Sequence, residues 1–435
     1  MGASALALVV AAGAFVALAQ PQVLVGEPLP LQWSLRYRDK PPPPKASDLA
    51  AATAAGADKP TAVQLGAVPA PVGVAPPDDP LVQSLAFRLQ QAVIAAGDVG
   101  DSGVYVMDAE GRVVFDLGGT MPLIPASTSK LVTAAAVLTA FGPDHRFITR
   151  LGATVPTSRG VIAGDLVLTG GGDPTLVSGT YMDQRVNPDR PQTSIADLAD
   201  QLVAAGITEV QGAVLGDPSF LQGGALADGW PSRYLDELDT SPISGLTIDQ
   251  GLTFVQEEGR VQARASSDPA ADAAAALTSA LVTRGITVGQ PSASVLGVAP
   301  TTAVEVGRLE SPPLMVLLER VVQHSDNHMA DTMFRAVGRR AEGVGTFADA
   351  AAMSQRVLAD LQLDWATTTL QDGSGLSRTS AIPPALLTTL NYRMTNSSVG
   401  EAWQQLMAVS GSSGTLRARL TDTIAELRLR GKTGS

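Results

Sequence analysis

A serine stands three residues before a lysine at the start of an apolar helical stretch, and this pair constrains the chain most. The stretch reads Ile-Pro-Ala-Ser-Thr-Ser-Lys-Leu-Val over residues 124–132. Residues three apart lie on one face of a helix, so Ser127 and Lys130 are expected to face each other. A lysine shielded from water has a lowered pKa and can take the proton of a serine hydroxyl. The pair therefore predicts an activated nucleophile, provided that the other groups of an acyl-transfer site follow.

Composition narrows the chemistry that is available. The 435-residue chain has no cysteine and three histidines, which are His145, His324 and His328. Thiolate nucleophiles and thiolate metal sites are thereby excluded, and so few histidines favour a lysine base. His324 and His328 have the i, i+4 spacing of a helical zinc pair, but Ser325 stands where that motif needs glutamate, so no metal or cofactor is expected. The net charge of −12, with no basic block, argues against a nucleic-acid partner.

The first segment, residues 1–22, is apolar and has small residues near its end. Ala3 to Ala19 is almost wholly apolar and closes on Ala-Leu-Ala, a pattern typical of a secretory signal and its cleavage site. The basic n-region of such a signal is missing, since the first basic residue is Arg36. Ala3 to Val25 is also long enough to span a bilayer, so an uncleaved membrane anchor is the open alternative. Either interpretation predicts export to the cell envelope, as a secreted or a membrane-anchored protein.

The rest of the chain divides by composition. Residues 23–79 are rich in Pro and Ala and predict a linker. Helical spacing of leucines begins the folded part, and a β-hairpin pattern and the Ser127 helix complete a first segment over residues 80–150. Short strand patterns broken by glycine-rich turns fill residues 151–305, and helical patterns return over 306–435. We therefore expect one domain built from two segments, with a strand-rich inserted region between them.

Two further motifs match the serine-lysine pair. Ser325-Asp326-Asn327 falls on a helix-to-helix junction, and Lys432-Thr433-Gly434-Ser435 falls on a strand pattern. A glycine inside a strand permits the close approach of another backbone or a ligand. Ser-x-x-Lys, Ser-Asp-Asn and Lys-Thr-Gly in this order form the motif set of penicillin-binding proteins and class A β-lactamases. Together they predict a serine acyl-transfer site.

With these motifs the chain resembles the D-alanyl-D-alanine carboxypeptidase/endopeptidase family, the class C low-molecular-weight penicillin-binding proteins. Ser127 and Ser325 are 198 residues apart, more than the compact class A β-lactamases leave, and the family is similar in carrying extra domains there. The resemblance covers about residues 80–435. Further similar stretches are Gly-Asp-Leu-Val-Leu-Thr-Gly-Gly-Gly-Asp-Pro-Thr-Leu (164–176), Asp-Gly-Ser-Gly-Leu-Ser-Arg (372–378) and Gly-Thr-Leu-x-x-Arg (414–419).

The resemblance implies a fold and an activity. The fold would be α/β (α+β), a transpeptidase-like antiparallel sheet flanked by helices. The activity would be that of a serine-type D-Ala-D-Ala carboxypeptidase, with or without endopeptidase activity, which hydrolyses peptidoglycan stem peptides and is acylated by β-lactams. Two alternatives stay open: a β-lactamase-like hydrolase, which would turn penicillin over rapidly, and a non-catalytic peptidoglycan-binding protein, which would form no covalent adduct.

Catalytic roles follow from the residue chemistry together with the resemblance. Ser127 would attack the carbonyl of the D-Ala-D-Ala bond, and Lys130 would be its base. Ser325 and Lys432 would deliver a proton to the leaving amine. Backbone N–H groups of Ser127 and Ser435 would form the oxyanion hole, where each donor is typically worth about 3–4 kcal/mol.

Substrate-binding roles are also implied by the resemblance. Asn327 would hold the amide carbonyl of the substrate. The Thr433 and Ser435 hydroxyls, on a strand that Gly434 opens to close approach, would bind the terminal carboxylate of the stem peptide. Arg378 would bind a second carboxylate of the stem peptide, or else serve as an ordinary surface arginine.

The chain also departs from the pattern of the family it resembles. Family members usually continue past Lys-Thr-Gly with two strands and a helix, and those strands separate the Lys-Thr-Gly strand from the N-terminal hairpin. No residue follows Ser435 in this sequence. We therefore expect the Lys432 strand to be an edge with unpaired backbone groups, and the chain, as a fragment, to be acylated weakly or not at all.

Overall fold

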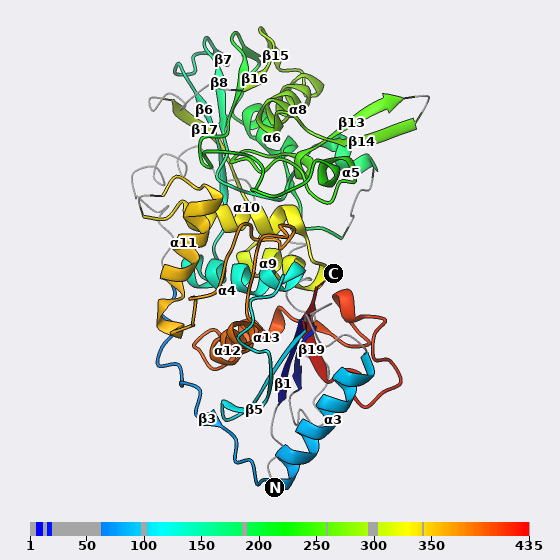
Figure 1. The fold of residues 1–435 in the computed structure, drawn as a ribbon. Helices are drawn as coiled ribbons and strands as arrows, with labels where there is room; N and C mark the ends of the chain where they lie inside the picture. The colour runs from blue at the N-terminus through cyan, green and yellow to red at the C-terminus, as the bar shows by residue number, and fades with distance from the viewer. Residues whose placement is uncertain are drawn as a thin grey trace.

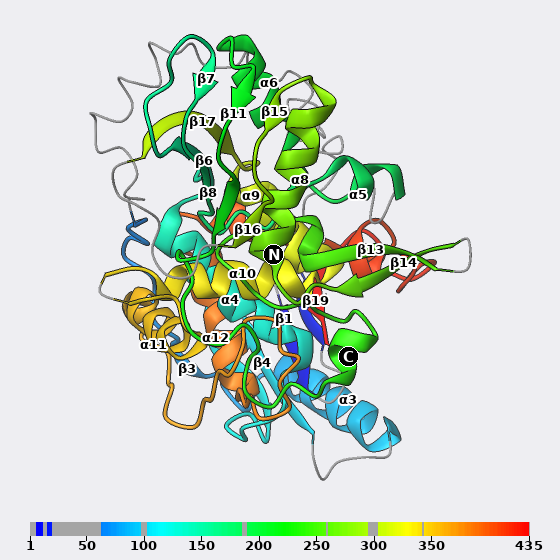
Figure 2. The same cartoon turned by 90° about the horizontal axis from the view of Figure 1, so that it is seen from above.

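The structure is a computed structural model with helices and strands in both of its lobes. It describes residues 6–11, 15–19, 62–96, 102–184, 189–257, 260–294, 303–341 and 343–434. Figure 1 shows an upper lobe formed by the middle of the chain and a lower lobe formed by its two outer parts, and Figure 2 shows both from above. The predicted mixture of helix and strand is therefore confirmed.

The main sheet of the lower lobe has seven strands. The element bounds are β1 (Leu6–Ala11), β2 (Phe15–Ala19), β3 (Gly73–Val74), β4 (Gly103–Asp108), β5 (Arg112–Leu117), β18 (Ala408–Val409) and β19 (Leu429–Thr433). Their order is β18-β19-β2-β1-β4-β5-β3, and every neighbouring pair is antiparallel except β3 and β5. The expected hairpin is β4 and β5, so alternation along these segments identified both strands.

The strand that carries Lys432 is not an edge. In β19, Gly431 pairs with Ala408 of β18 on one side and with Ala17 of β2 on the other. The expectation of unpaired backbone groups on this strand is therefore wrong, and with it the stated reason for expecting weak acylation.

Both β1 and β2 belong to the segment 1–22, which the sequence predicts to be a secretory signal or an anchor. The structure places these residues in the sheet as strands, between β4 and β19. Among the described residues, no helix is both long and apolar enough to cross a bilayer. The signal or anchor stays a prediction.

The end of the expected linker packs on the lower lobe. Residues 23–61 lie outside the described part of the chain. After them, Leu65 is 1% exposed and belongs to the main hydrophobic core. The Val63 amide donates to the Thr139 carbonyl at 2.8 Å, and the Leu65 carbonyl accepts from the Ser398 amide at 3.0 Å. The prediction of a linker therefore does not describe residues 62–79 well. A few apolar side chains in this Pro/Ala-rich stretch are enough to pack it against the lower lobe.

One helix forms the centre of the lower lobe. All twelve residues of α4 (Lys130–Phe141) are buried, as expected for a helix that is apolar on every side. Its neighbours include α9 (Leu314–His324), α10 (Asn327–Gly338), α11 (Phe347–Val357) and α12 (Pro384–Thr395). The remaining helical elements are α3 (Pro80–Ala96), α13 (Gly400–Gln405) and the 3₁₀ turns η1 (Ala126–Ser129), η3 (Ala359–Leu361) and η4 (Gly414–Leu416).

The upper lobe has its own sheets and its own core. Its strands are β6 (Ile148–Ala153), β7 (Val161–Ile162), β8 (Leu166–Thr169), β9 (Leu176–Val177), β10 (Thr193–Ser194), β11 (Glu209–Val210), β12 (Val214–Asp217), β13 (Leu252–Glu257), β14 (Arg260–Ala265), β15 (Thr287–Val288), β16 (Ala293–Ser294) and β17 (Val304–Glu310). Its helical elements are α5 (Gly179–Gln184), α6 (Ala196–Ala204), α7 (Arg233–Asp236), α8 (Pro269–Thr283) and the 3₁₀ turn η2 (Asp249–Gly251).

The chain enters and leaves the upper lobe on neighbouring strands. The larger sheet has the order β16-β12-β8-β6-β17, a second sheet has the order β15-β11-β7, and β9 with β10 and β13 with β14 form two-stranded sheets. In the larger sheet β6 and β17 pair antiparallel, with Thr149 opposite Leu309. The expected boundaries at residues 150/151 and 305/306 fall inside these two strands, and the division into domains stays a prediction. Because β6 follows α4 and β17 precedes α9, this pairing brings the two separated segments of the lower lobe together.

Candidate active site

Ser127 lies on a short turn that leads into α4. The turn is η1, and its backbone is held by the Pro125 carbonyl, which accepts from the amide and the hydroxyl of Thr128 at 3.1 Å and 2.5 Å. Ala126 has a left-handed φ of 45° there. Ser127 itself remains partly exposed, whereas Thr128, Ser129 and Lys130 are buried. The turn therefore presents one hydroxyl to the surface, directly before a buried helix.

Lys130 is fully buried and contacts the Ser127 hydroxyl. Its Nζ lies 3.1 Å from Ser127 Oγ, 2.7 Å from Asn327 Oδ1 and 2.6 Å from the Ser374 carbonyl oxygen. Burial lowers the pKa of Lys130 to about 8, although nearby carboxylates, first of all Asp331, act to raise it. The amine is thus held in a fixed position, with a pKa from which it can lose its proton near neutral pH.

A buried carboxylate fixes the loop beneath Lys130. Asp331 Oδ1 accepts from the backbone amides of Gly373 and Ser374 at 2.7 Å and 3.0 Å. This orients the Ser374 carbonyl that faces Lys130. Burial and the neighbouring Asp372 raise the pKa of Asp331. The sequence analysis missed Asp331, but its position four residues after Asn327 on one helix face was a usable signal.

The same loop approaches the Ser127 turn closely. Gly375 has a φ of +80°, and a Cβ atom on it would lie 1.8 Å from the Ala126 carbonyl oxygen. Only glycine fits there. Asp372 anchors the loop by accepting from Trp230 Nε1 at 2.8 Å and from the Ser377 amide at 2.6 Å. The distinctive 372–378 stretch therefore packs against the turn that carries Ser127. Through the contact between Asp372 and Trp230 it also connects this turn to the upper lobe.

Lys432, on strand β19 of the main sheet, is the second lysine of the candidate active site. Its Nζ donates to Ser325 Oγ at 3.0 Å and to the Thr433 carbonyl at 2.7 Å. Burial, followed by the charge of Lys130, lowers the pKa of Lys432 well below its usual value. Ser325 has a left-handed φ of 62° at the end of α9, which turns the chain into α10. The two lysines thus each contact one of the two predicted serines.

The end of β19 faces the Ser127 turn. A Cβ atom on Gly434 would lie 3.2 Å from the Pro125 carbonyl oxygen. The Thr433 hydroxyl contacts that of Thr415 at 3.0 Å, in η4. Ser435 lies outside the described residues. Arg378 ends the 372–378 loop and is exposed, and no hydrogen bond or ion pair joins it to another described residue.

The two histidines of the zinc-like spacing lie on different elements. His324 ends α9, whereas His328 is buried in α10, where burial lowers its pKa to about 3. In the part of the chain that the structure describes, no group of three or more His, Cys, Asp or Glu side chains is placed to hold a metal ion.

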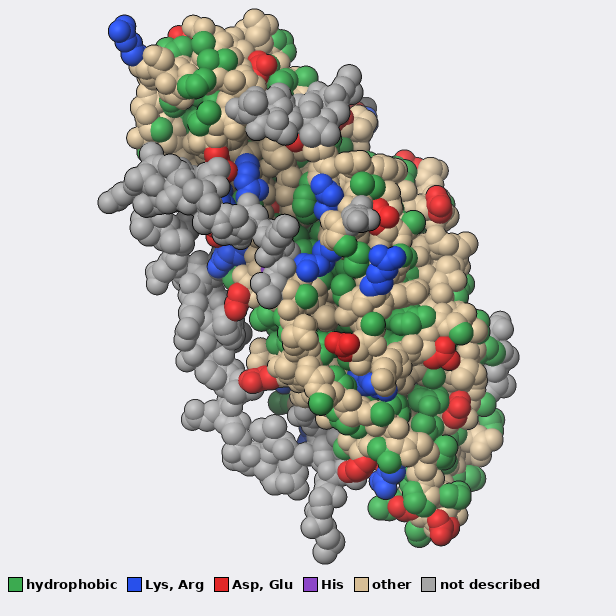
Figure 3. Space-filling model, turned by 90° about the vertical axis from the view of Figure 1, so that its left-hand side faces the viewer, with side chains coloured by type: hydrophobic (Ala, Val, Ile, Leu, Met, Phe, Trp, Pro, Cys, Tyr) green, Lys and Arg blue, Asp and Glu red, His purple; other side chains and the backbone are tan. Residues whose placement is uncertain are grey.

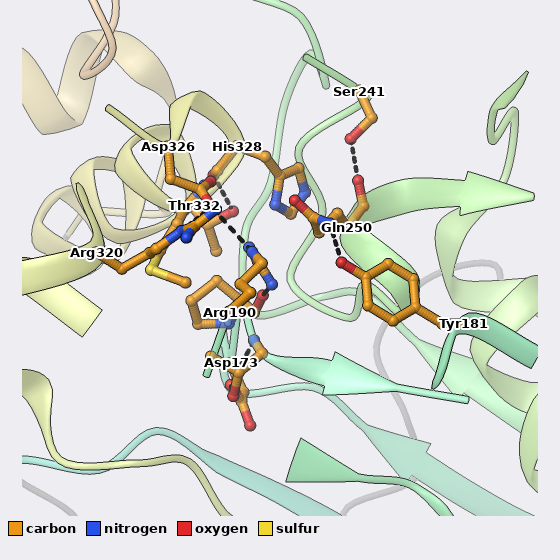
Figure 4. Close-up of polar contacts among 12 residues, drawn as sticks. Asp173, Tyr181, Arg190, Ser241, Gln250, Arg320, Asp326, His328 and Thr332 are labelled. Carbon is orange, nitrogen blue, oxygen red and sulfur yellow. Dashed lines mark hydrogen bonds and ion pairs between the residues drawn. The ribbon is translucent and has the colours of Figure 1, made fainter. Parts of the chain in front are cut away.

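The Ser325-Asp326-Asn327 turn is clamped by an arginine from the upper lobe. Asp326 Oδ2 lies 2.9 Å from Arg190 Nε and 3.6 Å from Arg320 Nε, and both guanidinium groups point at this carboxylate in Figure 4. Its Oδ1 caps α10 by accepting from the Met329 amide at 3.0 Å. Burial alone would raise the pKa of Asp326, but Arg190 and these further contacts outweigh it and hold the pKa below its usual range.

Arg190 is itself completely buried, with its side chain 0% exposed. Its Nη1 donates at 2.7 Å to the carbonyl oxygen of Pro174, in the Gly-Gly-Gly-Asp-Pro stretch that the sequence analysis singled out. No local pattern marks Arg190 in the sequence. The structure therefore adds a contact between the inserted region and the turn that carries Ser325 and Asn327.

We expect Arg190→Met to destabilise the protein by about 3–5 kcal/mol, because it leaves the buried Asp326 carboxylate without its main partner. Urea unfolding followed by circular dichroism measures this loss. Arg233→Met is the matched control, since Arg233 lies in the same inserted region but is half exposed, where it pairs with the exposed Glu237 and stacks on the Tyr234 ring. Equal unfolding midpoints for the two variants would contradict a structural role for the Arg190–Asp326 pair.

Comparison with known proteins agrees with this geometry. A model of the D-Ala-D-Ala carboxypeptidase 3 (S13) family matches residues 81–261 and 254–435. Carboxypeptidase DacB of Mycolicibacterium smegmatis is 31% identical over 378 residues, covering 83% of this chain and 77% of that protein. The D-alanyl-D-alanine carboxypeptidase of Actinomadura sp. (strain R39) is 29% identical over 400 residues, covering 77% of this chain and 73% of that protein.

Solved structures show the same architecture. The crystal structure of penicillin binding protein 4 (DacB) from Haemophilus influenzae matches with a TM-score of 0.64 and 21% identity, covering 75% of this chain and 82% of that one. At this identity the likeness bears on the fold, and it confirms the predicted fold class.

Proposed function

Because the chain belongs to the D-Ala-D-Ala carboxypeptidase 3 (S13) family, we propose that it hydrolyses the D-Ala-D-Ala bond of peptidoglycan stem peptides through an ester on Ser127. Its enzyme class is that of the serine-type D-Ala-D-Ala carboxypeptidases. The observation that carries the proposal is the 3.1 Å contact between Lys130 Nζ and Ser127 Oγ inside a buried polar cluster.

Proton transfer in the first step follows from the contacts of Lys130. A neutral amine has two N–H groups and one lone pair. With Asn327 Oδ1 and the Ser374 carbonyl as acceptors, both N–H groups are used, so the lone pair faces Ser127. The Ser127 hydroxyl then donates to Nζ and loses its proton as Oγ attacks the substrate carbonyl carbon.

Departure of the leaving group uses the second lysine. When the tetrahedral intermediate collapses, the C–N bond breaks and the nitrogen of the terminal D-Ala needs a proton. Ser325 can supply its hydroxyl proton and regain one from Lys432, which contacts it at 3.0 Å. Lys130 passes on the proton that it took from Ser127, which replaces the one that Lys432 gave up, and Lys130 is neutral again. Water then attacks the ester and gives a proton to Lys130, and when this second intermediate collapses the proton returns to Ser127 Oγ as the shortened peptide leaves as a carboxylic acid.

Substrate contacts are proposed for the groups around these lysines. Asn327 is held at both ends of its amide, since Oδ1 accepts from Lys130 and Nδ2 donates to the Asp239 carbonyl at 2.9 Å. The second N–H of Nδ2 remains for a substrate carbonyl. Thr433, beside the Lys432 charge, suits the terminal carboxylate. For Ser435 and Arg378 the roles stay those that the family resemblance implies.

β-Lactams are proposed as inhibitors that acylate Ser127, because they present the same kind of acyl carbonyl. Penicillin binding protein 4 of Haemophilus influenzae has been solved in complex with a β-lactam. Endopeptidase activity on cross-linked stem peptides and a location in the cell envelope, after cleavage or anchoring of residues 1–22, belong to the same proposal. N-terminal sequencing of the exported protein tests the cleavage.

Intact mass spectrometry with benzylpenicillin tests the proposed function. A long-lived adduct, together with release of D-alanine from diacetyl-L-Lys-D-Ala-D-Ala, supports a carboxypeptidase. Rapid turnover of penicillin without D-alanine release would support a β-lactamase-like hydrolase instead. Peptidoglycan binding without any adduct would support a non-catalytic binding protein.

The rate of acylation is expected to depend on pH through Lys130. Its pKa is lowered to about 8, and only the neutral amine accepts a proton. The rate should therefore rise about tenfold per pH unit below pH 8 and level off above it. Stopped-flow labelling with a fluorescent penicillin between pH 5.5 and 9.5 measures this profile. A flat profile between pH 6 and 9 would count against Lys130 as the base.

A further inference from the structure

A pocket with a volume of about 270 Å³ lies directly beside Asn327, between the two lobes. Arg320 of α9 and the start of α10 line it from the lower lobe, and the loop at Leu238 and strands β13 and β14 line it from the upper lobe. Asn327 Oδ1 accepts from Lys130, whereas its Nδ2 donates to the Asp239 carbonyl in the pocket wall. The pocket therefore adjoins the candidate active site, although the serines and lysines proposed above are not among the residues that line it.

Arg320 brings to this pocket a guanidinium group that has no hydrogen bond to another described residue. Its side chain is 13% exposed, and its one ion pair within the described part of the chain is with Asp326, 3.6 Å from Nε. Asp326 is already held by Arg190 at 2.9 Å. Two guanidinium groups thus share one carboxylate, so a second carboxylate in the pocket would complete the ion pairing of Arg320.

His328 adds an unsatisfied polar group to the same wall. The residue is 5% exposed, and neither of its ring nitrogens has a hydrogen-bond partner among the described residues. Burial lowers its pKa to about 3, so at pH 7 the ring is neutral, with one donor and one acceptor nitrogen. In Figure 4 the ring points from α10 toward Gln250. A buried polar group without a partner calls for an explanation, and a bound polar ligand supplies one.

The upper-lobe wall has an uncommon backbone conformation. Leu238 and Gln250 both line the pocket and have left-handed φ angles of 57° and 60°, and Asp249 has one of 55°. Such angles are unfavourable for residues other than glycine, and they cluster at ligand sites. Two contacts hold the turn in place: Asp249 accepts from the amide and hydroxyl of Ser178 at 2.7 Å and 2.6 Å, and Gln250 donates to the Tyr181 hydroxyl. The wall is thus fixed in shape before a ligand enters.

The charged side chains that line the pocket are Asp239, Arg320 and Asp326. Asp326 is paired as described above, and Asp239 is exposed on the upper-lobe wall. Water screens an exposed charge, whereas the largely buried Arg320 is screened less. The pocket therefore favours an anionic group at its buried end, beside Arg320.

Resting on the proposed function, we propose that this pocket binds a carboxylate of the part of the substrate peptide that remains on Ser127, with Arg320 as its ionic partner and His328 as a second donor. A guanidinium fork matches a carboxylate in a bidentate manner. This carboxylate is neither the terminal one, which leaves with D-alanine, nor the one assigned to Arg378 by resemblance.

The place of this carboxylate in the peptide follows from Asn327. Its free N–H is assigned to a substrate carbonyl, and it lies between Lys130 and the pocket, so the chain that precedes D-Ala-D-Ala is the part that reaches the pocket. Arg320 lies five residues before Ser325, about 7–8 Å along the helix axis. That distance is about two extended residues or one long side chain. The carboxylate therefore belongs to the residue that precedes D-Ala-D-Ala or to the one before it.

Two pairs of peptides test the proposal, each pair differing only by a carboxylate and a carboxamide. The first pair is acetyl-X-D-Ala-D-Ala and the second is acetyl-X-Lys(acetyl)-D-Ala-D-Ala, with L-Glu or L-Gln as X. Release of D-alanine gives kcat/KM for the native chain, Arg320→Gln and Arg320→Lys. Exposed basic side chains occur on both lobes (Figure 3), and Arg88→Gln on α3 is the control for the loss of one of them. The peptides are also titrated calorimetrically into Ser127→Ala, with and without Arg320→Gln.

We expect the native chain and Arg88→Gln to prefer the carboxylate peptide of at least one pair about tenfold or more. In Arg320→Gln the preference should fall to about twofold or less, and Arg320→Lys should restore part of it. The pair that shows the preference identifies the residue that carries the carboxylate. Asp239→Asn should keep or increase the preference, because it removes a like charge.

Equal kcat/KM values within both pairs on the native chain, or a preference that survives Arg320→Gln, would overturn the proposal. Loss of the preference in Asp239→Asn but not in Arg320→Gln would also overturn it, in favour of a cationic group. If no peptide releases D-alanine, the proposed function fails, and binding to Ser127→Ala then decides the pocket by the same comparison. The fold of Arg320→Gln should persist, since Arg190 still pairs with Asp326. The preference of the native chain tests the pocket even if that variant does not fold.

Discussion

Ser127→Ala is expected to abolish the covalent penicillin adduct and to lower D-alanine release by about four orders of magnitude or more, because no other group can form the ester. Intact mass with and without benzylpenicillin measures the adduct, and D-amino acid oxidase measures the alanine. The fold should persist, since Ser127 is only partly buried and its turn is held by the Pro125 carbonyl.

Ser129→Ala is the matched control for this substitution. Ser129 lies two residues further along the same turn, and its buried hydroxyl has no hydrogen-bond partner among the described residues. Its removal should leave acylation intact. A stoichiometric adduct on Ser127→Ala, mapped by peptide mass spectrometry to another residue, would refute the assignment of the nucleophile.

Lys130→Met is expected to slow acylation by about 10²–10⁴-fold, the usual contribution of a positioned acid or base. The rise of the rate toward pH 8 should disappear with it, because the titrating group that sets the profile is gone. Fluorescent penicillin labelling across the pH range measures both effects. Loss of rate with an unchanged pH profile would contradict the base role.

Lys130→Arg separates a base from a fixed charge. Arginine keeps the positive charge beside Asp331 and Asp372 but does not lose its proton in this pH range. If Lys130 acts as the base, the arginine variant should be about as slow as the methionine variant. Acylation near the native rate in Lys130→Arg would mean that only the charge matters. Circular dichroism and thermal unfolding show whether either variant is folded.

Local patterns were enough to predict the groups that meet in the candidate active site. The spacing of Ser127 and Lys130 acts within one helical turn, and the structure joins their side chains directly. The polar turn at Ser325 falls between two helices, and the motif at Lys432 falls on a strand, because helical and alternating periodicities depend on neighbouring residues. Contacts among these groups were expected only from the family resemblance.

Supporting residues were beyond the reach of these patterns. Arg190 reaches Asp326 across 136 residues of sequence, and Trp230 reaches Asp372 across 142. No periodicity relates such positions, since their proximity depends on how the upper lobe packs on the lower one. The pairing of β19 with β2 was mispredicted for the same reason: hydropathy identifies an apolar segment but not its partner strand.

The sequence by itself determined the serine that we propose as nucleophile, the two lysines, the turn between α9 and α10, and the family, because each depends on residue identity over a few positions. Tertiary structure alone decided which carboxylate lies under Lys130 and which arginine holds Asp326. Burial and charge at a point depend on every chain segment that reaches it. Hence the lowered pKa of Lys130, which supports its proposed role as a base, is a property of the folded protein.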